Sequence, residues 1–316
     1  MLAVDLRAGG DGVGEAEVAR ARHALARLPC PSLALGDASA GPAAAALVAS
    51  FDIVADSEAE LEPVVAVIRA MPMAATALVQ LLRHSETESV HEALIAESLV
   101  YSMLQAGPEF RAWLAKRELR KGHRHESELA PAVLVERHGD RLDLTLNRPK
   151  KHNAFSAEMR DALCEGLRVA LGDASIREVR LCGAGRSFSS GGDLDEFGTL
   201  PDPVTAHLIR STRNAGRMLS DCSDRVVCFV HGACVGAGAE LPAFAGRVIA
   251  APDATFQLPE VAMGLVPGAG GTASIQRRIG RQRTAALALS GRRVDATTAL
   301  RWGLVDELGN RHDLRA

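Results

Sequence analysis

The sequence has few aromatic residues and little net charge. Phe, Trp and Tyr together make up 3% of the 316 residues, and Tyr101 is the single tyrosine. The core must therefore be aliphatic and rich in alanine, and an apolar content of 47% is enough for a sizeable one. The formal net charge of −3 argues against a nucleic-acid or anionic-membrane surface, because such surfaces need clustered positive charge.

Closely spaced cysteines and long apolar runs are also missing. The six cysteines are scattered, with no C-x-x-C pair and no Cys/His ligand cluster, so we expect reduced thiols in the cytoplasm and no metal site. No run of about 20 apolar residues could span a membrane. The opening MLAVDLRAGGDG lacks a basic stretch followed by an apolar one, so we expect no signal peptide.

The apolar pattern divides the chain into two regions. Residues 131–316 alternate between strand-like and helix-like segments, which predicts an α/β domain. Residues 1–118 carry apolar side chains mainly at i, i+3, i+4 spacing, which predicts a mainly helical region. Residues 119–130 are polar and charged, and we interpret them as a linker.

The sequence also predicts single elements of the α/β domain. Leucines alternate with polar residues over Leu142–Leu146, which predicts a strand. Ser156 is the expected cap of the helix that follows. Val204–Leu219 has a helical pattern, and a further helix is expected to open at Glu240.

A faint internal repeat relates the two regions. When Leu33–Leu61 is laid over Cys228–Phe256 without a gap, Ile53 falls on Val248 and several alanines coincide. Alanine is frequent in this chain, so coincident alanines are weak evidence for a repeat. A decayed copy of part of the α/β region and a chance similarity therefore both remain open.

Two glutamates occupy an unusually apolar stretch. Glu240 and Glu260 lie within GAGAELPAFAGRVIAAPDATFQLPEVAMGLVPGAGG, residues 236–271, where Arg247 is the one basic residue between them. A buried carboxylate without a partner is costly, so its pKa rises and it tends to take up a proton. Such a pair is either a folding liability or an acid/base device.

Four motifs surround these glutamates in a fixed order. Each motif alone is weak evidence for a function, because a glycine-rich segment usually indicates only a tight turn of the backbone. They are NRPKKHNAFS (Asn147–Ser156), RSFSSGGDLDEF (Arg186–Phe197), HGACVGAGAEL (His231–Leu241) and QLPEVAMGLVPGAGGT (Gln257–Thr272). On these motifs the chain resembles the crotonase, or enoyl-CoA hydratase/isomerase, superfamily over about residues 131–310.

The resemblance implies both a fold and a chemistry. The fold is α/β: a crotonase-like spiral of repeated ββα turns, here with an additional N-terminal helical region. By motif match, the backbone amides of Gly192 and Ala237 would stabilise the oxygen of a thioester enolate, by roughly 3–4 kcal/mol each. Glu240 would activate a water molecule, and Glu260 would exchange the proton at the α-carbon.

The resemblance also implies a path for the coenzyme A part of the substrate. Lys150, Lys151 and His152 would meet its phosphates, and backbone groups of Ala154 and Ser190 would bond the adenine. Basic loop residues that are merely solvated are the alternative. No separate cofactor and no metal is implied.

These features favour an enzyme that hydrates a 2-enoyl-CoA to a 3-hydroxyacyl-CoA. Two glutamates favour water addition, whereas Leu258, where hydratases usually have a glutamine, slightly disfavours it. A double-bond isomerase and a non-catalytic scaffold of the same fold stay as alternatives.

The partners expected are an acyl-CoA substrate and further copies of the chain, and neither nucleic acid nor membrane. The family's C-terminal helices, which build trimers often paired as hexamers, are missing after Gly309. Residues 51–117 resemble them, although an unrelated helical addition remains possible in principle. We therefore expect a homo-oligomer, a trimer or hexamer, with Tyr101 facing the core or an interface rather than taking part in catalysis.

Overall fold

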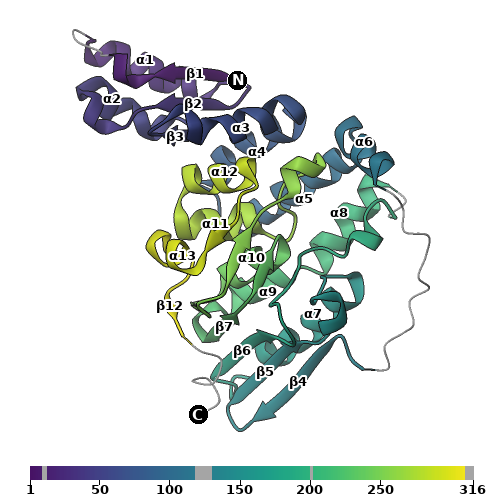
Figure 1. Ribbon diagram of the computed structural model, residues 1–316. Coiled ribbons are helices and arrows are strands. Elements are labelled where there is room, and N and C mark those ends of the chain that lie inside the picture. The colour runs from purple at the N-terminus through teal and green to yellow at the C-terminus, as the bar shows by residue number, and fades with distance from the viewer. Residues whose placement is uncertain (9–12, 118–129, 200–201, 310–316) are drawn as a thin grey trace.

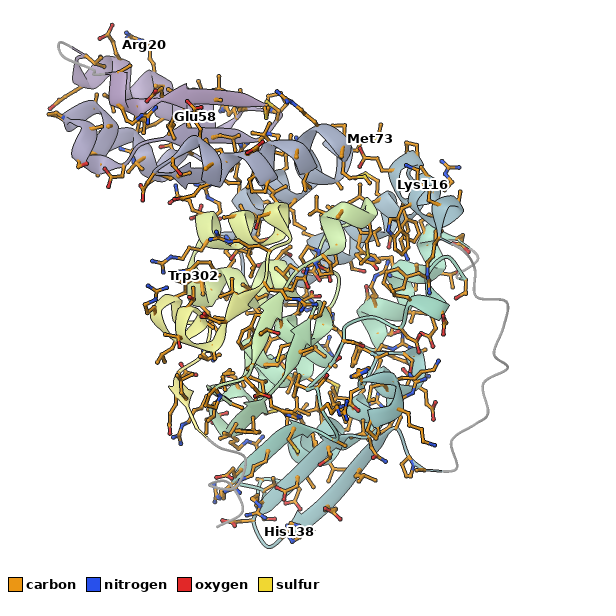
Figure 2. All side chains as sticks on the ribbon, viewed as in Figure 1. Arg20, Glu58, Met73, Lys116, His138 and Trp302 are labelled. Atoms are coloured by element: carbon orange, nitrogen blue, oxygen red, sulfur yellow. The ribbon has the colours of Figure 1, made fainter. Side chains whose placement is uncertain are left out.

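The computed structural model describes residues 1–8, 13–117, 130–199 and 202–309. All but the last residue of the predicted linker, residues 119–130, lies outside these ranges. Figure 1 shows an N-terminal unit at one end of the molecule and the main sheet at the other. Arg20 and His138 mark these two ends in Figure 2.

The α/β region contains two sheets. The larger has the strand order β12-β9-β7-β6-β5-β4, and the smaller has the order β11-β10-β8. Neighbouring strands are parallel except in the pairs β4/β5 and β10/β11. The bounds are β4 Val133–His138, β5 Arg141–Leu146, β6 Glu178–Gly183, β7 Val226–Val230, β8 Ala233–Val235, β9 Arg247–Ala250, β10 Thr255–Gln257, β11 Val294–Asp295 and β12 Glu307–Leu308.

The chain crosses twice from one sheet of this region to the other. It passes from β7 to β8, and later from β9 to β10, each time moving from the larger sheet to the smaller one. One helical segment leads from β8 back to β9 of the larger sheet, and another leads from β11 back to β12. This is the two-layered ββα arrangement that the resemblance implies.

Seven helices accompany these strands in the part of the region that the structure describes. Ser156 begins the first of them, as predicted, because its hydroxyl accepts a hydrogen bond from the Met159 amide at 3.2 Å. The bounds are α7 Ala157–Gly172, α8 Pro203–Thr212, α9 Ala215–Asp221, α10 Ala237–Glu240, α11 Gly271–Ile279, α12 Arg281–Ser290 and α13 Ala296–Trp302. Short 3-10 helices in this region cover Pro149–Lys151, Leu194–Glu196, Ser223–Arg225, Pro242–Phe244 and Glu260–Met263.

Two predicted helix bounds were wrong. The sequence pattern predicted one helix over Val204–Leu219, but the chain breaks between α8 and α9, where the Asn214 side chain accepts the Arg217 amide at 2.9 Å. The pattern also predicted that a helix opens at Glu240. Instead Glu240 is the last residue of α10, which starts directly after Gly236.

The first 117 residues are mainly helical, as predicted, but they begin with three parallel strands that were not. The strands are short, and β2 is buried along its whole length, so no alternation of polar and apolar residues marks it. The bounds are β1 Leu2–Asp5, α1 Glu15–Ala26, β2 Ser32–Leu35, α2 Pro42–Leu47, β3 Ile53–Ala55, α3 Glu58–Ala70, α4 Pro72–Ser85, α5 Val90–Gln105 and α6 Pro108–Lys116. Short 3-10 helices cover Leu6–Ala8, Ala38–Ala40 and Val48–Ser50.

The pairing of β2 with β3 has the register that the internal repeat predicts. Leu33 lies opposite Ile53 in this pair, and Cys228 lies opposite Val248 in the pair of β7 with β9. The proposed alignment places Leu33 on Cys228 and Ile53 on Val248. The shared register supports a second copy of part of the fold, whose origin stays a hypothesis.

The N-terminal helices pack directly on the α/β region. Helices α4 and α5 contact α11, and α3 and α4 contact α12, so that they lie between the N-terminal sheet and the core strands (Figure 1). The buried Asp52 forms an ion pair with Arg281 at 2.9 Å, which links the end of this sheet to the first turn of α12. The N-terminal region therefore covers apolar surface of the core.

Among the described residues, no single helix combines the length and apolar character needed to cross a membrane. Helices α3 and α4 pass such a test only as a pair, and that pair is bent by 112°.

Candidate active site

A cavity of about 180 Å³ lies where α5, α7, α8, α9 and α10 meet. Its lining includes all four residues that the motifs assigned to catalysis: Gly192, Ala237, Glu240 and Glu260. These residues come from three different motifs, and the ββα fold brings them together. The cavity also receives side chains from α5 in the N-terminal region, which no motif indicated.

The glycine before α10 brings the two glutamates close together. Gly236 has φ of 51°, a backbone conformation that side chains disfavour. A Cβ atom at this residue would lie 2.3 Å from Oε1 of Glu260. The Glu260 carboxyl therefore lies directly beside the start of the one-turn helix that ends with Glu240.

The two predicted oxyanion donors are available. Within the described part of the chain, neither the Gly192 amide nor the Ala237 amide donates a hydrogen bond, although their neighbours do. The Gly236 amide donates to the Gln257 carbonyl at 2.9 Å, and the Asp193 amide donates to the Phe155 carbonyl at 3.1 Å. Ala237 is the first residue of α10, where an amide has no partner inside the helix.

Gly192 also satisfies a packing constraint. A Cβ atom there would lie 2.8 Å from the ring of Phe197, another residue of the cavity wall. A side chain at this residue would therefore displace the ring. Glycine allows the wall and the free amide to lie side by side.

Two carboxylates share the backbone amides at the start of α11. Glu240 Oε2 accepts hydrogen bonds from the amides of residues 269 and 271, both at 2.8 Å. Glu97, from α5, accepts from the amides of residues 270 and 272 at 2.7 and 3.0 Å, and from the Thr272 hydroxyl at 2.6 Å. Successive amides at the start of α11 therefore alternate between a carboxylate of the α/β region and one of the N-terminal region. The start of a helix favours such negative charge.

Burial raises the pKa of the three carboxyls of the cavity lining that are fully buried, Glu97, Glu240 and Glu260. The pKa of Glu97 rises to about 7 and that of Glu260 to about 8, in both cases chiefly because the charged form loses its water. The pKa of Glu240 lies well above its ordinary value, through burial first and then through the neighbouring charges of Glu260 and Glu97. The three groups therefore share protons at neutral pH instead of all being ionised.

Hydrogen bonding decides where the negative charge resides within the pair Glu240 and Glu260. Glu240 receives two amide hydrogen bonds, which stabilise its ionised form. Oε2 of Glu260 is buried and has no hydrogen-bond partner among the described residues. We therefore assign the charge to Glu240 and the proton to Glu260. Glu240 can then act as a base and Glu260 as an acid in the same cavity.

Tyr101 lies on the cavity wall, on the same helix as Glu97. Its ring is buried against Gly268, as predicted for a core-facing residue. The guanidinium of Arg210, from α8, lies 4.6 Å from the centre of the ring. Tyr101 therefore combines the expected core position with a place in the cavity, although it was not expected near the site.

The predicted coenzyme A residues lie together but outside the cavity lining. The Ser190 amide donates to the His152 carbonyl at 2.9 Å, and the Ala154 amide donates to the Lys151 carbonyl at 3.0 Å. Both amides are thus used within the protein. The Ala154 carbonyl also accepts hydrogen bonds from the Ser156 amide and the Arg148 guanidinium, each at 3.1 Å. The predicted backbone bonds to adenine are therefore narrowed to the Ser190 carbonyl. Lys150 and the ring of His152 are exposed and stay candidates for phosphate contact.

The acidic residues after the glycine pair restrain one of these lysines. Lys151 forms ion pairs with Asp195 at 3.3 Å and with Asp193 at 3.8 Å. Glu196 lines the cavity and accepts the Ala157 amide at 2.8 Å. Residues 195 and 196 therefore both have specific partners.

Sequence reasoning missed several residues of the cavity wall that lie outside the motifs. Among them are Glu97, Arg210 and Tyr101. A glutamate on the apolar face of a helix was the one available signal, as in the segment ALIAESL around Glu97. Within the described residues, no group of three or more His, Cys, Asp or Glu side chains could hold a metal ion.

Comparisons with known proteins agree with this geometry. The family model described as Enoyl-CoA hydratase/isomerase matches residues 140–316. The 1,2-epoxyphenylacetyl-CoA isomerase of Escherichia coli is 38% identical over 169 residues, which cover 52% of this chain and 64% of the relative. The 2,3-dehydroadipyl-CoA hydratase of the same organism is 33% identical over 177 residues, which cover 56% of this chain and 68% of the relative.

Solved structures show the same similarity in the same region. The enoyl-CoA hydratase of Thermoplasma volcanium matches with a TM-score of 0.54 and 32% identity, over 59% of this chain and 75% of that one. The enoyl-CoA hydratase of Mycobacterium smegmatis gives a TM-score of 0.55 at 29% identity, over 59% and 73% of the two chains.

The matches cover only part of this chain and only part of its relatives. The alignment spans just under two thirds of the isomerase, and residues 1–139 fall outside the family match. The match nevertheless covers more than half of the 316 residues and includes all four predicted catalytic residues. The chain therefore belongs to the enoyl-CoA hydratase/isomerase family.

Proposed function

We propose that this protein hydrates a 2-enoyl-CoA thioester to a 3-hydroxyacyl-CoA. One observation carries the proposal: two buried carboxyls with raised pKa values and two unbonded backbone amides line a single cavity. The relatives named above as acyl-CoA hydratase and isomerase are consistent with this chemistry. Coenzyme A enters as part of the substrate, and we propose that no further cofactor is needed.

The proposed reaction uses each group for a separate task. The amides of Gly192 and Ala237 donate to the thioester oxygen, where negative charge develops, and each is worth roughly 3–4 kcal/mol in the transition state. Ionised Glu240 takes a proton from a water molecule while the water oxygen bonds to the β-carbon. The electron pair of the double bond moves towards the thioester, and protonated Glu260 then delivers its proton to the α-carbon.

This sequence adds one water across the double bond. Glu240 ends protonated and Glu260 ends ionised, so a proton exchange between the cavity and solvent restores the starting state. Carboxyl pKa values near neutral pH suit such transfers, because each group can both accept and release a proton at the working pH. A double-bond isomerase needs a single carboxyl for the same proton shuttle, so the second one favours hydration.

A direct absorbance assay tests the proposal. Hydration of crotonyl-CoA removes the absorbance of its conjugated enoyl thioester, and isomerisation of a 3-enoyl-CoA would instead create it. We expect loss of absorbance with the wild-type protein, and turnover at least ~100-fold lower with Glu260→Gln. Glu62→Gln on the exposed face of α3 is the matched control and should behave as wild type.

The alternatives give distinct results in this assay. Near-wild-type turnover by Glu260→Gln would contradict the role of that carboxyl. Reaction with the 3-enoyl thioester alone would establish the isomerase. No reaction with either thioester, despite binding, would favour the scaffold.

We also propose that the protein acts in the cytoplasm as a homotrimer or a pair of trimers. Apolar side chains remain exposed on two adjacent helices, Leu99 and Met103 on α5 and Val204 and Leu208 on α8, with exposed fractions of 52 to 67%. Exposed apolar patches of this kind often mark interfaces between chains. Light scattering after size-exclusion chromatography measures the assembly directly, and a monomer at micromolar concentration would contradict the proposal.

A further inference from the structure

Three arginines line the wall of the active-site cavity. Arg160 comes from α7, Arg210 comes from α8, and Arg213 directly follows α8. None of the roles proposed above for water, the α-carbon or the thioester oxygen uses them. Their charge requires a separate explanation, because placing like charges around a partly closed cavity is unfavourable.

One carboxylate serves two of these arginines. Asp161 forms an ion pair with Arg160 at 2.8 Å through one oxygen, and with Arg213 through the other. Within the described residues, Arg210 has no carboxylate within ion-pair distance. Of the three arginines, Arg210 is therefore the one without a direct carboxylate partner among the described residues.

The contacts of Arg210 are with neutral groups. Its guanidinium donates to the Ser98 and Ser102 hydroxyls and to the Gln105 side-chain oxygen, with distances of 3.4 Å to Ser98 and 3.3 Å for the closer bond to Gln105. Its flat face lies over the Tyr101 ring. Nη1 carries two hydrogens and makes a single hydrogen bond to the described residues, so one N–H remains available.

The surroundings of Arg210 favour an anion beside it. The pKa of Arg210 lies below its ordinary value, chiefly because burial removes water from the guanidinium. The positive charge of Arg160 lowers the pKa further, whereas Tyr101 and Glu97 raise it. Glu196 also lines the cavity, but its carboxylate accepts the amide at the start of α7. A half-buried guanidinium of this kind gains most from a ligand carboxylate, which forms short, charge-assisted hydrogen bonds.

We infer that the cavity selects acyl-CoA thioesters whose acyl group itself carries a carboxylate, and that Arg210 binds this carboxylate. Arg210 is then a specificity-determining residue. The inference relies on the proposed function for the placement of the thioester at Gly192 and Ala237. It concerns binding, however, and it can be tested without turnover.

A second source of negative charge must be separated from the first. The phosphates of coenzyme A would also attract arginines, whichever acyl group is attached. Thioesters of pantetheine lack the nucleotide and its phosphates but keep the reactive end. A preference that persists in pantetheine thioesters therefore belongs to the acyl group.

Calorimetric binding of saturated thioesters provides the test, since these ligands cannot be hydrated. The probes are succinyl-, glutaryl- and adipyl-CoA, each compared with the thioester in which the terminal carboxylate is a carboxamide. We expect the wild-type protein to bind at least one acid roughly 10- to 100-fold more tightly than its amide. The same preference should appear in the pantetheine series.

Variants then assign the preference to a residue. Arg210→Gln should abolish the preference, and Arg210→Lys should retain part of it, because the charge remains while the fork of donors is lost. Arg217→Gln on α9 removes an exposed arginine outside the cavity lining and should leave the preference unchanged. Thermal melting confirms that each variant is folded.

The outcomes are separable from those of the hydration assay. Equal binding of acid and amide by the wild-type protein would overturn the inference, whatever the variants do. Loss of the preference in the pantetheine series would assign Arg210 to the coenzyme A phosphates and would also overturn it. An acid preference in a protein that hydrates no enoyl-CoA would uphold the inference and refute the proposed function.

Discussion

Replacing Glu260 by glutamine should stabilise the folded protein while it removes activity. Glu260 is buried, and its pKa in the folded state is about 8, against an ordinary value of 4.5. As the pH rises from about 4.5 to about 8, the unfolded chain releases this proton and the folded chain retains it. The free energy of unfolding of the wild-type protein therefore falls over this window. Glutamine carries no such proton, so the variant loses this part of the pH dependence.

The size of the effect follows from the two pKa values. Each pKa unit corresponds to about 1.4 kcal/mol, so the span sets an upper limit of about 5 kcal/mol above pH 8. Relaxation around an ionised carboxyl and the imperfect fit of an amide both reduce this limit. We expect Glu260→Gln to be more stable than wild type by about 1–3 kcal/mol at alkaline pH, and about equal to it below pH 4.5.

Urea denaturation followed by circular dichroism measures this difference. Curves recorded at about pH 5 and about pH 8.5 for wild type, Glu260→Gln and the exposed control Glu62→Gln give the free energy of unfolding of each. The control should follow wild type at both pH values. A variant that is less stable than wild type at pH 8.5 would refute the claim that this carboxyl is buried without a stabilising partner.

Three further predictions concern neighbouring groups. Glu240→Gln should impair hydration more than α-proton exchange in deuterated water, followed by mass spectrometry, and equal loss of both would contradict the division of roles. Gly236→Ala should lower turnover at least ~10-fold, because the new Cβ would lie 2.3 Å from the Glu260 carboxyl and the backbone has φ of 51°. An unchanged rate in the enoyl-CoA assay would refute this prediction. Glu97→Ala should cost about 2–4 kcal/mol in urea denaturation, because the amide and hydroxyl of Thr272 lose their buried acceptor, whereas a cost below about 0.5 kcal/mol would show that this carboxyl is not needed there.

Local signals in the sequence predicted much of the α/β region. The alternation of Leu142, Leu144 and Leu146 marks β5, where these side chains are buried and the residues between them are partly exposed. Ser156 marks the start of α7 through its cap. Such features depend on neighbours a few residues away, so the sequence alone displays them.

The features that were missed depend on contacts between distant residues. Glu97 bonds the amide of residue 270, which is 173 residues further along the chain. No spacing rule connects these residues, because the contact arises only when α5 packs against α11. The strands of the N-terminal sheet were missed for a related reason: β2 is buried by the helices around it and shows no alternation of its own.

The motifs predicted the site better than the composition could. Gly192, Ala237, Glu240 and Glu260 lie in three separate motifs, and the resemblance assigned them to one site before their positions were known. The cavity brings these four residues together. Arg210 belongs to no motif, and this is consistent with a residue that selects among substrates rather than one that performs the shared chemistry.

A crystal structure with bound 3-hydroxybutyryl-CoA would show whether the thioester binds at the two free amides. We expect the thioester oxygen to lie about 2.7–3.1 Å from both the Gly192 and Ala237 nitrogens. We also expect Glu240 to face the β-hydroxyl and Glu260 to face the α-carbon. A thioester oxygen bound elsewhere, with either amide left without it, would refute the proposed oxyanion site.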